Sequence, residues 1–351
     1  MTTIFPSFSE EKLLEQILHH QIISIIGLGK NVGKTTTLNY LINLLSPNQK
    51  IAVTSIGRDG EKYDEVFGTP KPRIYINEGT ILALARNSLE NSDISIEILE
   101  STMINTPLGN IIIVRALSAG YVELTGPSTS HELKKVFNIF QQFGSEIILV
   151  DGAVNRRSFA SPIITNATIL ATGASISPNF DEIILETEFF AKILTIPALE
   201  KTRIKKLVDQ IPKIGIINED NNVISFSVQS SLDLPDSMLE LIDEKTRYFI
   251  VKGVFSNSLL DKLFSTISPH QPLTIVIPDS TKIFLDRNRF NLLQKTKWEL
   301  KVLKAIRLLC ITVNPTSPLG YEFNRTLLLQ ELRRRISVPI FDVYQGFENE
   351  K

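Results

Sequence analysis

The apolar residues of this chain form two alternating kinds of segment. Short continuous apolar runs are typical of buried strands, and they occur at 22–26, 51–55, 147–150 and 168–174. Between them, apolar residues recur three and four positions apart, as on a helix with one buried face; the first such segments are 9–20 and 36–45. Because strand, helix and strand repeat in this order, we predict an α/β protein with a mostly parallel sheet and flanking helices.

One pair of predicted strands is joined by a turn rather than by a helix. Strands are expected at 94–99 and 110–114, and the residues Asn105-Thr106-Pro107-Leu108-Gly109 between them suit a tight turn. A connection this short predicts an antiparallel hairpin, since parallel strands need a longer crossover. Another strand is expected at 73–76, and further helices are expected at 79–88, 131–143 and 179–194.

The second half of the chain continues the same α/β rhythm. Strands are predicted at 223–228, 248–254, 273–277, 307–313 and 338–343, and helices at 256–267, 288–304 and 322–335. The basic run 201–206 is expected to be an exposed helix face or a linker. The chain is therefore expected to have two domains, 1–205 and 206–351, with a C-terminal α/β domain. The alternative is that the second half extends the first sheet.

Composition and charge exclude several classes of function. The chain has 351 residues, 43% hydrophobic and 21% charged, with a formal net charge of −1, so no global field attracts it to nucleic acid or an anionic membrane. Cys310 is the single cysteine, which excludes an internal disulfide and a multi-cysteine metal site. No apolar run reaches the roughly 18 residues of a membrane span, and we expect a cytoplasmic protein.

The segment with the strongest chemical signal is Gly27-Leu28-Gly29-Lys30-Asn31-Val32-Gly33-Lys34-Thr35, which lies between the first predicted strand and the next helix. Strand, glycine-rich loop, Gly-Lys-Thr and helix describe a phosphate-binding loop. In such a loop the backbone N–H groups surround the phosphates, the lysine reaches the β and γ oxygens, and the hydroxyl holds Mg²⁺. The residues expected to contact a nucleotide are Gly27, Gly29, Lys30, Asn31, Val32, Gly33, Lys34, Thr35 and Thr36.

The spacing of the glycines departs from the usual pattern by one position. Four residues normally separate the first glycine from the Gly-Lys pair, which would place that glycine at Leu28, whereas the chain has glycines at 27 and 29. The alternative is a plain glycine turn that carries an exposed lysine and threonine. The flanking strand and helix both favour the phosphate-binding interpretation.

A second motif is the predicted strand 147–150, which ends in Asp151-Gly152. A carboxylate directly after a buried strand suits a Mg²⁺ ligand, because the cation offsets the charge of a triphosphate. We therefore expect Thr35 and Asp151 to hold Mg²⁺, directly or through water. The alternative is an aspartate that only caps a turn. Arg156 follows closely and is a candidate for stabilising charge at the γ-phosphate, or else a surface arginine.

Other chemistries find little support in the sequence. A GTPase is expected to have Asn-Lys-x-Asp after a late strand, and the nearest segment, 217–221, lacks that lysine and the correctly spaced aspartate. This favours ATP, or a base that is bound mainly by backbone contacts. The histidines 19, 20, 131 and 270 lack zinc-ligand spacing, and there is no Gly-x-Ser-x-Gly elbow. The loop 314–320 leaves a predicted strand and is either a ligand loop or a proline- and glycine-rich turn. The polar cluster 279–282 at a predicted strand end is expected to be a plain loop, and the alternative is an anion-binding site.

The Gly33-Lys34-Thr35-Thr36 motif, the acidic loop 57–64 and Val150-Asp151-Gly152 resemble the P-loop class that includes dethiobiotin synthetase, nitrogenase iron protein and ParA partition ATPases. The resemblance covers about the first 200 residues. It implies that an acidic residue after the second strand places Mg²⁺ or polarises the attacking group; Asp59 is our choice, and Glu61 and Asp64 are alternatives. That class often has a lysine five positions before the last lysine, where this chain has Gly29, so the intersubunit role is not carried over to Lys30.

Two segments also resemble a narrower group. Residues 54–61 and 150–158 are similar to P-loop proteins associated with cobalamin-dependent amino-acid aminomutases, among them a reactivase subunit for a lysine aminomutase. This resemblance implies a protein partner, a cobalamin-dependent aminomutase.

Three hypotheses follow from these observations. The first is a Mg-ATP-binding, ATP-hydrolysing accessory or reactivating factor for a partner enzyme, with Lys34, Asp59, Asp151 and Arg156 as its catalytic residues and a homodimer as one possible state. The second is an ATP-dependent small-molecule kinase or carboxylate-activating ligase. The third is a nucleotide-stabilised scaffold that does not hydrolyse ATP. No nucleic-acid partner is expected under any of them.

Overall fold

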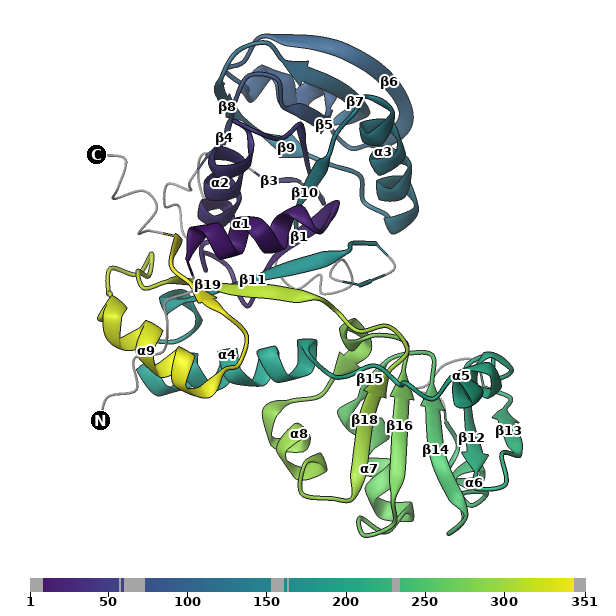
Figure 1. Ribbon diagram of the computed structural model, residues 1–351. Helices are drawn as coiled ribbons and strands as arrows, with labels where there is room; N and C mark the ends of the chain where they lie inside the picture. The colour runs from purple at the N-terminus through teal and green to yellow at the C-terminus, as the bar shows by residue number, and fades with distance from the viewer. Residues whose placement is uncertain are drawn as a thin grey trace. The chain divides into compact units, whose positions relative to one another are not determined.

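The computed structural model describes residues 9–56, 58–59, 73–152, 161–162, 164–228 and 234–343. The chain divides into two compact units. The first contains Met1–Glu188 and Arg307–Lys351, and the second contains Phe189–Ile306. Each unit has its own sheet and its own hydrophobic core, and each is described by itself (Figure 1).

The first unit is built on a nine-stranded sheet in the order β20-β19-β11-β1-β10-β2-β5-β7-β6, counted over the described residues. Its strands are β1 (Ile22–Gly27), β2 (Ile51–Ser55), β5 (Ile81–Ala85), β6 (Ile96–Thr106), β7 (Gly109–Ala116), β10 (Ile147–Asp151), β11 (Ala167–Gly173), β19 (Leu308–Asn314) and β20 (Ile340–Phe341). All neighbouring pairs from β20 to β5 are parallel, and β7 and β6 form the antiparallel hairpin at one edge.

Helices cover both faces of this sheet (Figure 1). They are α1 (Glu10–Leu18), α2 (Lys34–Leu45), α3 (Ser130–Gln142) and α9 (Arg325–Arg335), with short 3₁₀ turns η1 (Arg86–Asn91) and η3 (Ala174–Ile176). Helix α4 (Phe180–Leu194) begins in the first unit and ends in the second, where Phe189 and Ile193 join the core. Small antiparallel pairs join β3 (Arg58–Asp59) to β9 (Leu124–Thr125) and β4 (Ile74–Ile76) to β8 (Gly120–Val122).

The alternation of side chains along the strands divides the core of the first unit into two layers. In β10, Ile147 and Leu149 pack with the apolar faces of α1 and α2, whereas Ile148 and Val150 pack with α3. All four side chains are buried. A parallel strand that is covered on both faces needs a continuous apolar run, which is the pattern of the first predicted strands.

The second unit has a five-stranded sheet in the order β13-β12-β14-β16-β18. Its strands are β12 (Ile214–Asn218), β13 (Val223–Phe226), β14 (Thr246–Val251), β16 (Leu273–Ile277) and β18 (Trp298–Val302), and the last three are parallel. Its helices are α5 (Thr202–Asp209), α6 (Asp236–Leu239), α7 (Asn257–Thr266) and α8 (Arg287–Leu293). Helices α7 and α8 pack on one face of the sheet and α5 packs on the other.

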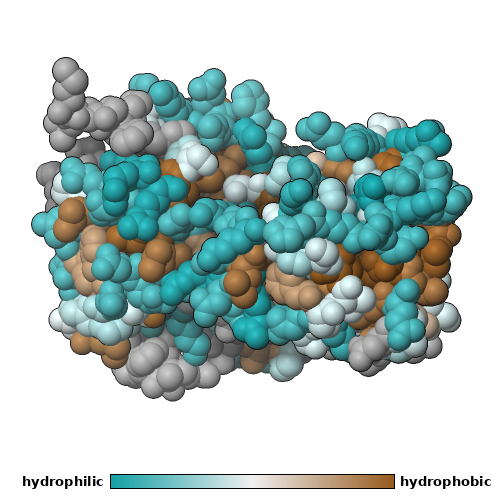
Figure 2. Space-filling model, turned by 90° about the horizontal axis from the view of Figure 1, so that it is seen from below, coloured by the Kyte–Doolittle hydropathy of each residue, from teal (hydrophilic) through white to brown (hydrophobic). Residues whose placement is uncertain are grey.

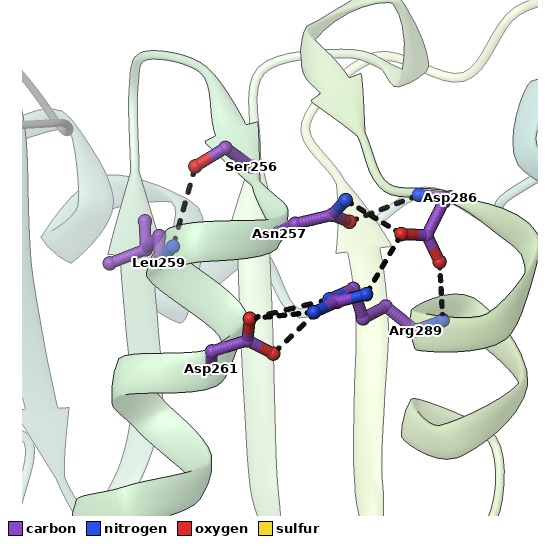
Figure 3. Close-up of polar contacts among 6 residues, drawn as sticks. All are labelled: Ser256, Asn257, Leu259, Asp261, Asp286 and Arg289. Carbon is purple, nitrogen blue, oxygen red and sulfur yellow. Dashed lines mark hydrogen bonds and ion pairs between the residues drawn. The ribbon is translucent and has the colours of Figure 1, made fainter.

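Polar side chains hold the starts of α7 and α8 together in the second unit (Figure 3). The Ser256 hydroxyl accepts a hydrogen bond from the Leu259 amide at 3.3 Å, and an Asp286 carboxylate oxygen accepts one from the Arg289 amide at 2.8 Å. Asn257 and Asp286 exchange two hydrogen bonds of 2.7 and 3.0 Å, and the Arg289 guanidinium contacts both Asp286 and Asp261 at 3.1 Å. Both helices are therefore capped by their own side chains.

Short segments that follow β14 and β16 pack beside the starts of these helices. A short parallel pair joins β15 (Phe255–Ser256) to β17 (Ile283–Phe284). The turn η5 (Ser280–Lys282) follows β16, and the buried carboxylate of Asp279 accepts hydrogen bonds from the backbone and hydroxyl of Thr281. The cluster 279–282 is thus a capped turn, as expected from the sequence.

The prediction of an α/β fold with a mostly parallel sheet is confirmed, and so is the antiparallel hairpin. The predicted helix at 79–88 is wrong: Ile81–Ala85 is strand β5, buried on both faces in the sheet. The predicted helix 288–304 ends at Leu293, and β18 follows it, pairing with β16. Strand β12 was not predicted.

The expected division at residues 205 and 206 differs from the units of the structure. Residues 307–351 belong to the first unit, because β19 pairs with β11 and β20 pairs with β19. Residues 189–205, assigned to the first domain from the sequence, belong to the second unit. The alternative in which the later chain extends the first sheet therefore holds for 307–351, whereas 189–306 form a separate unit.

The surface mixes hydrophilic residues with smaller hydrophobic patches on the face shown in Figure 2. Large apolar side chains that are strongly exposed include Met103 on β6 and Leu319 after β19. In the described part of the chain, no helix has both the length and the apolar character that crossing a bilayer requires.

Candidate functional site

The parallel strands of the first unit bring distant parts of the chain to one edge of the sheet. Strand β1 lies between β10 and β11, and Ile25 is in register with Asp151 while Gly27 is in register with Ala171. One strand further out, Gly173 is in register with Asn314 at the end of β19. Ligands of open α/β sheets bind at the carboxyl ends of such strands, and the 28–33 loop leaves β1 at this edge.

The backbone of this loop alternates in handedness. Asn31 has φ +58° and Gly33 has φ +95°, whereas Val32 between them stays outside the left-handed region. Successive residues of opposite handedness turn their backbone N–H groups toward a common centre and form an anion-binding nest. A non-glycine residue at positive φ is uncommon, so Asn31 marks a backbone shape that the surrounding structure maintains.

Two side chains from other strands hold the carbonyl groups of the loop. The Ser175 hydroxyl donates to the Lys30 carbonyl at 2.7 Å, and the Asn314 amide donates to the Asn31 carbonyl at 3.2 Å. In a trans peptide the C=O and the following N–H point in opposite directions. These two bonds therefore orient the amides of Asn31 and Val32 away from Ser175 and Asn314, which leaves both amides directed to the opposite side of the loop.

The loop ends at the first turn of α2. Gly33 is the N-cap residue of this helix, and no side chain caps it. The first N–H groups of a helix have no partner within the helix, and together with the helix dipole they favour an anion. The nest and the start of α2 are contiguous, so their N–H groups form one electropositive surface.

The Lys34 side chain passes directly over Gly27. A Cβ atom at position 27 would lie 2.9 Å from both Cγ and Cδ of Lys34 and 2.7 Å from a methyl carbon of Val32. By contrast, a Cβ at Gly29 would meet nothing closer than 3.6 Å. Lys34 is only 9% exposed. The packing of both Val32 and Lys34 therefore favours glycine at position 27, which gives a physical reason for the unusual glycine spacing.

The three threonines after Lys34 have different surroundings. Thr35 and Thr36 are half-buried in the first turn of α2. Thr37 is buried; its hydroxyl donates to the Gly33 carbonyl at 2.9 Å and lies 2.8 Å from the Thr312 hydroxyl of β19. Thr37 therefore fixes the helix start against the sheet, whereas Thr35 and Thr36 are the hydroxyls placed nearest the nest in sequence.

Asp151 lies at the carboxyl end of β10 and is fully buried. The next residue, Gly152, donates from its amide to the Ile25 carbonyl of β1 at 2.8 Å. A Cβ on Gly152 would lie 2.8 Å from that same oxygen, so the glycine permits the close approach of the two strand ends. The Asp151 carboxylate is thereby held on the strand next to the one that leads into the loop.

The remaining predicted site residues are described to different extents. The Asp59 backbone pairs with Leu124 in the short β3–β9 sheet, and its side chain lies outside the described residues. Arg156, Glu61 and Asp64 also lie outside the described residues. Lys30 is exposed, and its carbonyl is the group that Ser175 binds. The structure thus brings the loop, Lys34 and the end of β10 to one sheet edge.

Ser175 is a site residue that sequence reasoning missed. It follows β11 and is 145 positions from its partner Lys30, so no local pattern indicates the contact. Its neighbour Ala174 accepts a hydrogen bond from the Tyr321 hydroxyl at 2.9 Å, which ties η3 to the segment after β19. The sequence offers the segment 314–320 as a ligand loop or a turn, and the structure places its first residue, Asn314, against the backbone of the 28–33 loop.

Other candidate chemistry is limited. Within the described ranges, no group of three or more His, Cys, Asp or Glu residues is arranged to hold a metal ion by protein ligands alone. Burial raises the pKa of the Cys310 thiol to about 12, so it stays protonated and unreactive at neutral pH.

Comparison with known proteins finds no matching family model, no matching curated protein and no matching solved structure. The fold defines the chain as a mixed α/β protein with helices on both faces of a largely parallel sheet. The geometry of the 27–37 segment and its neighbours is the basis for the functional argument.

Proposed function

We propose that the chain binds Mg-ATP at the carboxyl edge of the first sheet, with its phosphates in the 27–35 loop. The observation that carries the proposal is the alternating backbone of Asn31, Val32 and Gly33 at the uncapped start of α2. This arrangement presents several N–H groups to one point, where a phosphate group is the best match in charge and shape. Lys34, packed over Gly27, adds a positive charge to the same segment.

Mg²⁺ is assigned to Thr35 and Asp151, directly or through water. The burial of Asp151 beside β1 supports this role, because a carboxylate in a low-dielectric position interacts strongly with a divalent cation. A triphosphate supplies the additional oxygen ligands that Mg²⁺ prefers. Asp59 and Arg156 are proposed to complete the surroundings of the γ-phosphate, and Asp59 to contribute to Mg²⁺ binding.

The proposed activity is nucleotide-driven action on a partner enzyme, accompanied by ATP hydrolysis. Coupling is supported by the bonds from Ser175 and Asn314 to the loop, because they link its backbone to the ends of β11 and β19. A loop that tightens around phosphates would displace these two side chains and the segments that follow them. The resemblance in residues 54–61 and 150–158 suggests a cobalamin-dependent aminomutase as the partner.

The binding site is tested by titrating Mg-ATP into the full chain and into Lys34→Ala. Hydrogen bonds to charged groups contribute about 1.5–3 kcal/mol, so we expect Kd to rise at least about tenfold. Lys50→Ala is the matched control, because it removes an exposed lysine from outside the loop, just before β2, and should change Kd less than about threefold. An unchanged affinity in Lys34→Ala would remove the site assignment.

The output is tested by measuring phosphate release with the purified chain, with candidate aminomutases and with small metabolites. The accessory-factor proposal predicts that partner capture differs between ATP, ADP and no nucleotide. Capture that is indifferent to nucleotide, together with turnover that rises sharply with one metabolite, would replace it with the kinase or ligase hypothesis. Binding without phosphate release under all conditions would support the scaffold.

A further inference from the structure

The second unit contains a pocket of about 660 Å³ at the amino ends of its parallel strands. We call it the amino-edge pocket. It is lined by the start of α5, by the turn after β12 and by the first residues of β14, β16 and β18. Its volume is within the range of roughly 300–1,000 Å³ that small-molecule sites occupy.

The charges in the amino-edge pocket are unbalanced in favour of cations. Lys201, Arg203, Arg247 and Lys297 line it together with Glu219 and Glu299. The four cations and two carboxylates sum to +2, in a chain whose formal net charge is −1. The imbalance is local, so it points to a ligand rather than to the general character of the surface.

Both carboxylates already have cationic partners. Glu219 pairs with Arg247 at 2.5 Å, and Glu299 pairs with Lys301 at 3.8 Å. Across the described part of the chain, no carboxylate lies within ion-pair distance of Lys201, Arg203 or Lys297. These three cations come from the start of α5 and the start of β18, so they flank the pocket on two sides.

The lining of the pocket also includes an aromatic ring and a few apolar side chains. Tyr248 is 9% exposed, and the Lys201 ammonium donates to its hydroxyl at 3.2 Å and lies 5.9 Å from the ring centroid. Ile204, Pro272 and Leu273 are the apolar neighbours in the lining. The volume of the pocket leaves room for an anion bound by the three cations to place a flat apolar group against the exposed part of the Tyr248 ring.

We propose that the amino-edge pocket binds a small phosphate monoester that carries a flat apolar group. A phosphate monoester has a charge of about −1.5 to −2 at neutral pH, which suits a pocket with a net charge of +2 better than a single carboxylate does. The site lies within the second unit and uses none of the residues assigned to ATP. It is a separate binding function.

The probe for the experiment is phenyl phosphate, and its binding is followed by saturation-transfer NMR on the full-length chain. The measurement is made in the Lys34→Ala variant as well as in the wild type, so that binding at the proposed nucleotide loop is recognised separately. We expect Lys201→Ala/Lys297→Ala to raise the Kd of phenyl phosphate at least tenfold. The affinity should also fall as salt is added, since exposed charges are screened.

The matched control is Lys295→Ala/Lys304→Ala, which removes the same charge from exposed positions outside the pocket. It should leave Kd within twofold of the parent, and thermal unfolding should show that both double variants are folded. Equal Kd values for the two double variants would overturn the pocket assignment. Benzoate that binds as tightly as phenyl phosphate would overturn the phosphate assignment, and benzyl alcohol that binds equally well would overturn the role of the anion.

Discussion

The start of helix α2 in the first unit differs from the starts of α7 and α8 in the second unit. The comparison shows how side chains near a helix start decide whether its N–H groups are bonded within the protein or left for an anion. All three helices follow strand segments at the carboxyl side of their parallel sheets. In α7 and α8, Ser256 and Asp286 accept hydrogen bonds from the chain's own amides. In α2 the N-cap is Gly33, which has no side chain to do so. The starts of α7 and α8 are thus satisfied by neighbouring side chains, whereas no side chain caps the start of α2.

The same contrast extends to the residues around these helix starts. In the second unit, Asn257, Asp261 and Arg289 complete a network of charged and amide groups around Asp286. In the first unit, glycine 27 and the side chains of Ser175 and Asn314 act on the backbone instead, and they preserve the shape of the loop. A protein can therefore use side chains either to occupy a helix start or to keep it accessible.

The largest effect is expected from adding one methyl group at Gly27, the last residue of β1, where the Lys34 side chain packs. Gly27→Ala would place a Cβ within 2.9 Å of Lys34 and Val32, so the lysine must move. We expect Mg-ATP affinity to fall about 100-fold and the free energy of unfolding to fall by about 1–3 kcal/mol, as for other overpacked sites. The measurement is nucleotide titration together with chemical unfolding.

Gly29→Ala is the control for this substitution, because its Cβ would meet no atom closer than 3.6 Å. It should change affinity by less than about threefold. If the two variants bound nucleotide equally well, the packing of Lys34 over Gly27 would have no role in binding.

The second prediction concerns the side-chain cap at the start of α8. Asp286→Ala removes the cap of α8 and the bonds to Asn257 and Arg289, so we expect a loss of about 1–2 kcal/mol in the free energy of unfolding. Mg-ATP affinity should not change. The single tryptophan, Trp298, lies in the second unit and the single cysteine, Cys310, in the first. Trp298 fluorescence and Cys310 thiol reactivity therefore report on the two units separately.

Asp261→Ala is the control here, because it removes an exposed ion pair with Arg289 and leaves the cap in place. Such pairs contribute about 0–1 kcal/mol. An Asp286→Ala variant that lost nucleotide binding, or whose Cys310 transition moved as far as its Trp298 transition, would contradict the separation of roles between the two units.

A smaller effect is expected from the side chains that hold the loop carbonyls. Ser175→Ala and Asn314→Ala each remove one hydrogen bond to the loop backbone. One such bond contributes about 1 kcal/mol, so we expect Kd for Mg-ATP to rise about fivefold in each variant. Ser177→Ala, whose hydroxyl accepts only from the Asn179 amide among the contacts described, is the control. Unchanged affinity in both loop variants would mean that the loop keeps its shape without them.

The smallest effect concerns pH. Hydrogen bonding from the Arg289 amide, followed by the charge of Arg289, lowers the pKa of Asp286 below its ordinary value of 3.8. A lowered carboxyl pKa contributes stability above the unfolded-state pKa, and that contribution is lost as the pH falls through the lower folded-state value. The difference in unfolding free energy between the wild type and Asp286→Asn should therefore be constant near neutral pH and shrink below about pH 4. A difference that grew in acid would contradict the assignment.

Local patterns in the sequence predicted much of the first unit. The run 22–26, the following glycine loop and the helical spacing of 36–45 predicted strand, loop and helix, and β1 and α2 confirm that order. The position of Asp151 after an apolar run predicted a strand end, which β10 confirms. Nucleotide binding by these residues stays a prediction. Such features are readable because each depends on neighbours a few positions away.

The two wrong helix predictions have different causes. Ile81–Ala85 contains leucine and alanine, which favour helices in isolation. It is nevertheless strand β5, because it pairs with β2 along one edge and with β7 along the other. Segment 298–302 alternates apolar and polar residues, but its strand character is completed by pairing with β16. In β5 the tertiary environment outweighs the intrinsic preference of the residues, whereas in β18 the local alternation agrees with the strand that forms.

The sequence by itself determined the loop, its lysine and threonines, and the apolar runs that form the centre of the first sheet. Only the tertiary structure decided that β19 joins β11, that Ser175 and Asn314 bind the loop carbonyls, and that Gly27 lies beneath Lys34. The physical reason is the range of the interactions. Periodicity and turn chemistry act between near neighbours, whereas strand pairing and side-chain contacts join residues separated by more than a hundred positions, whose meeting depends on the packing of the whole unit.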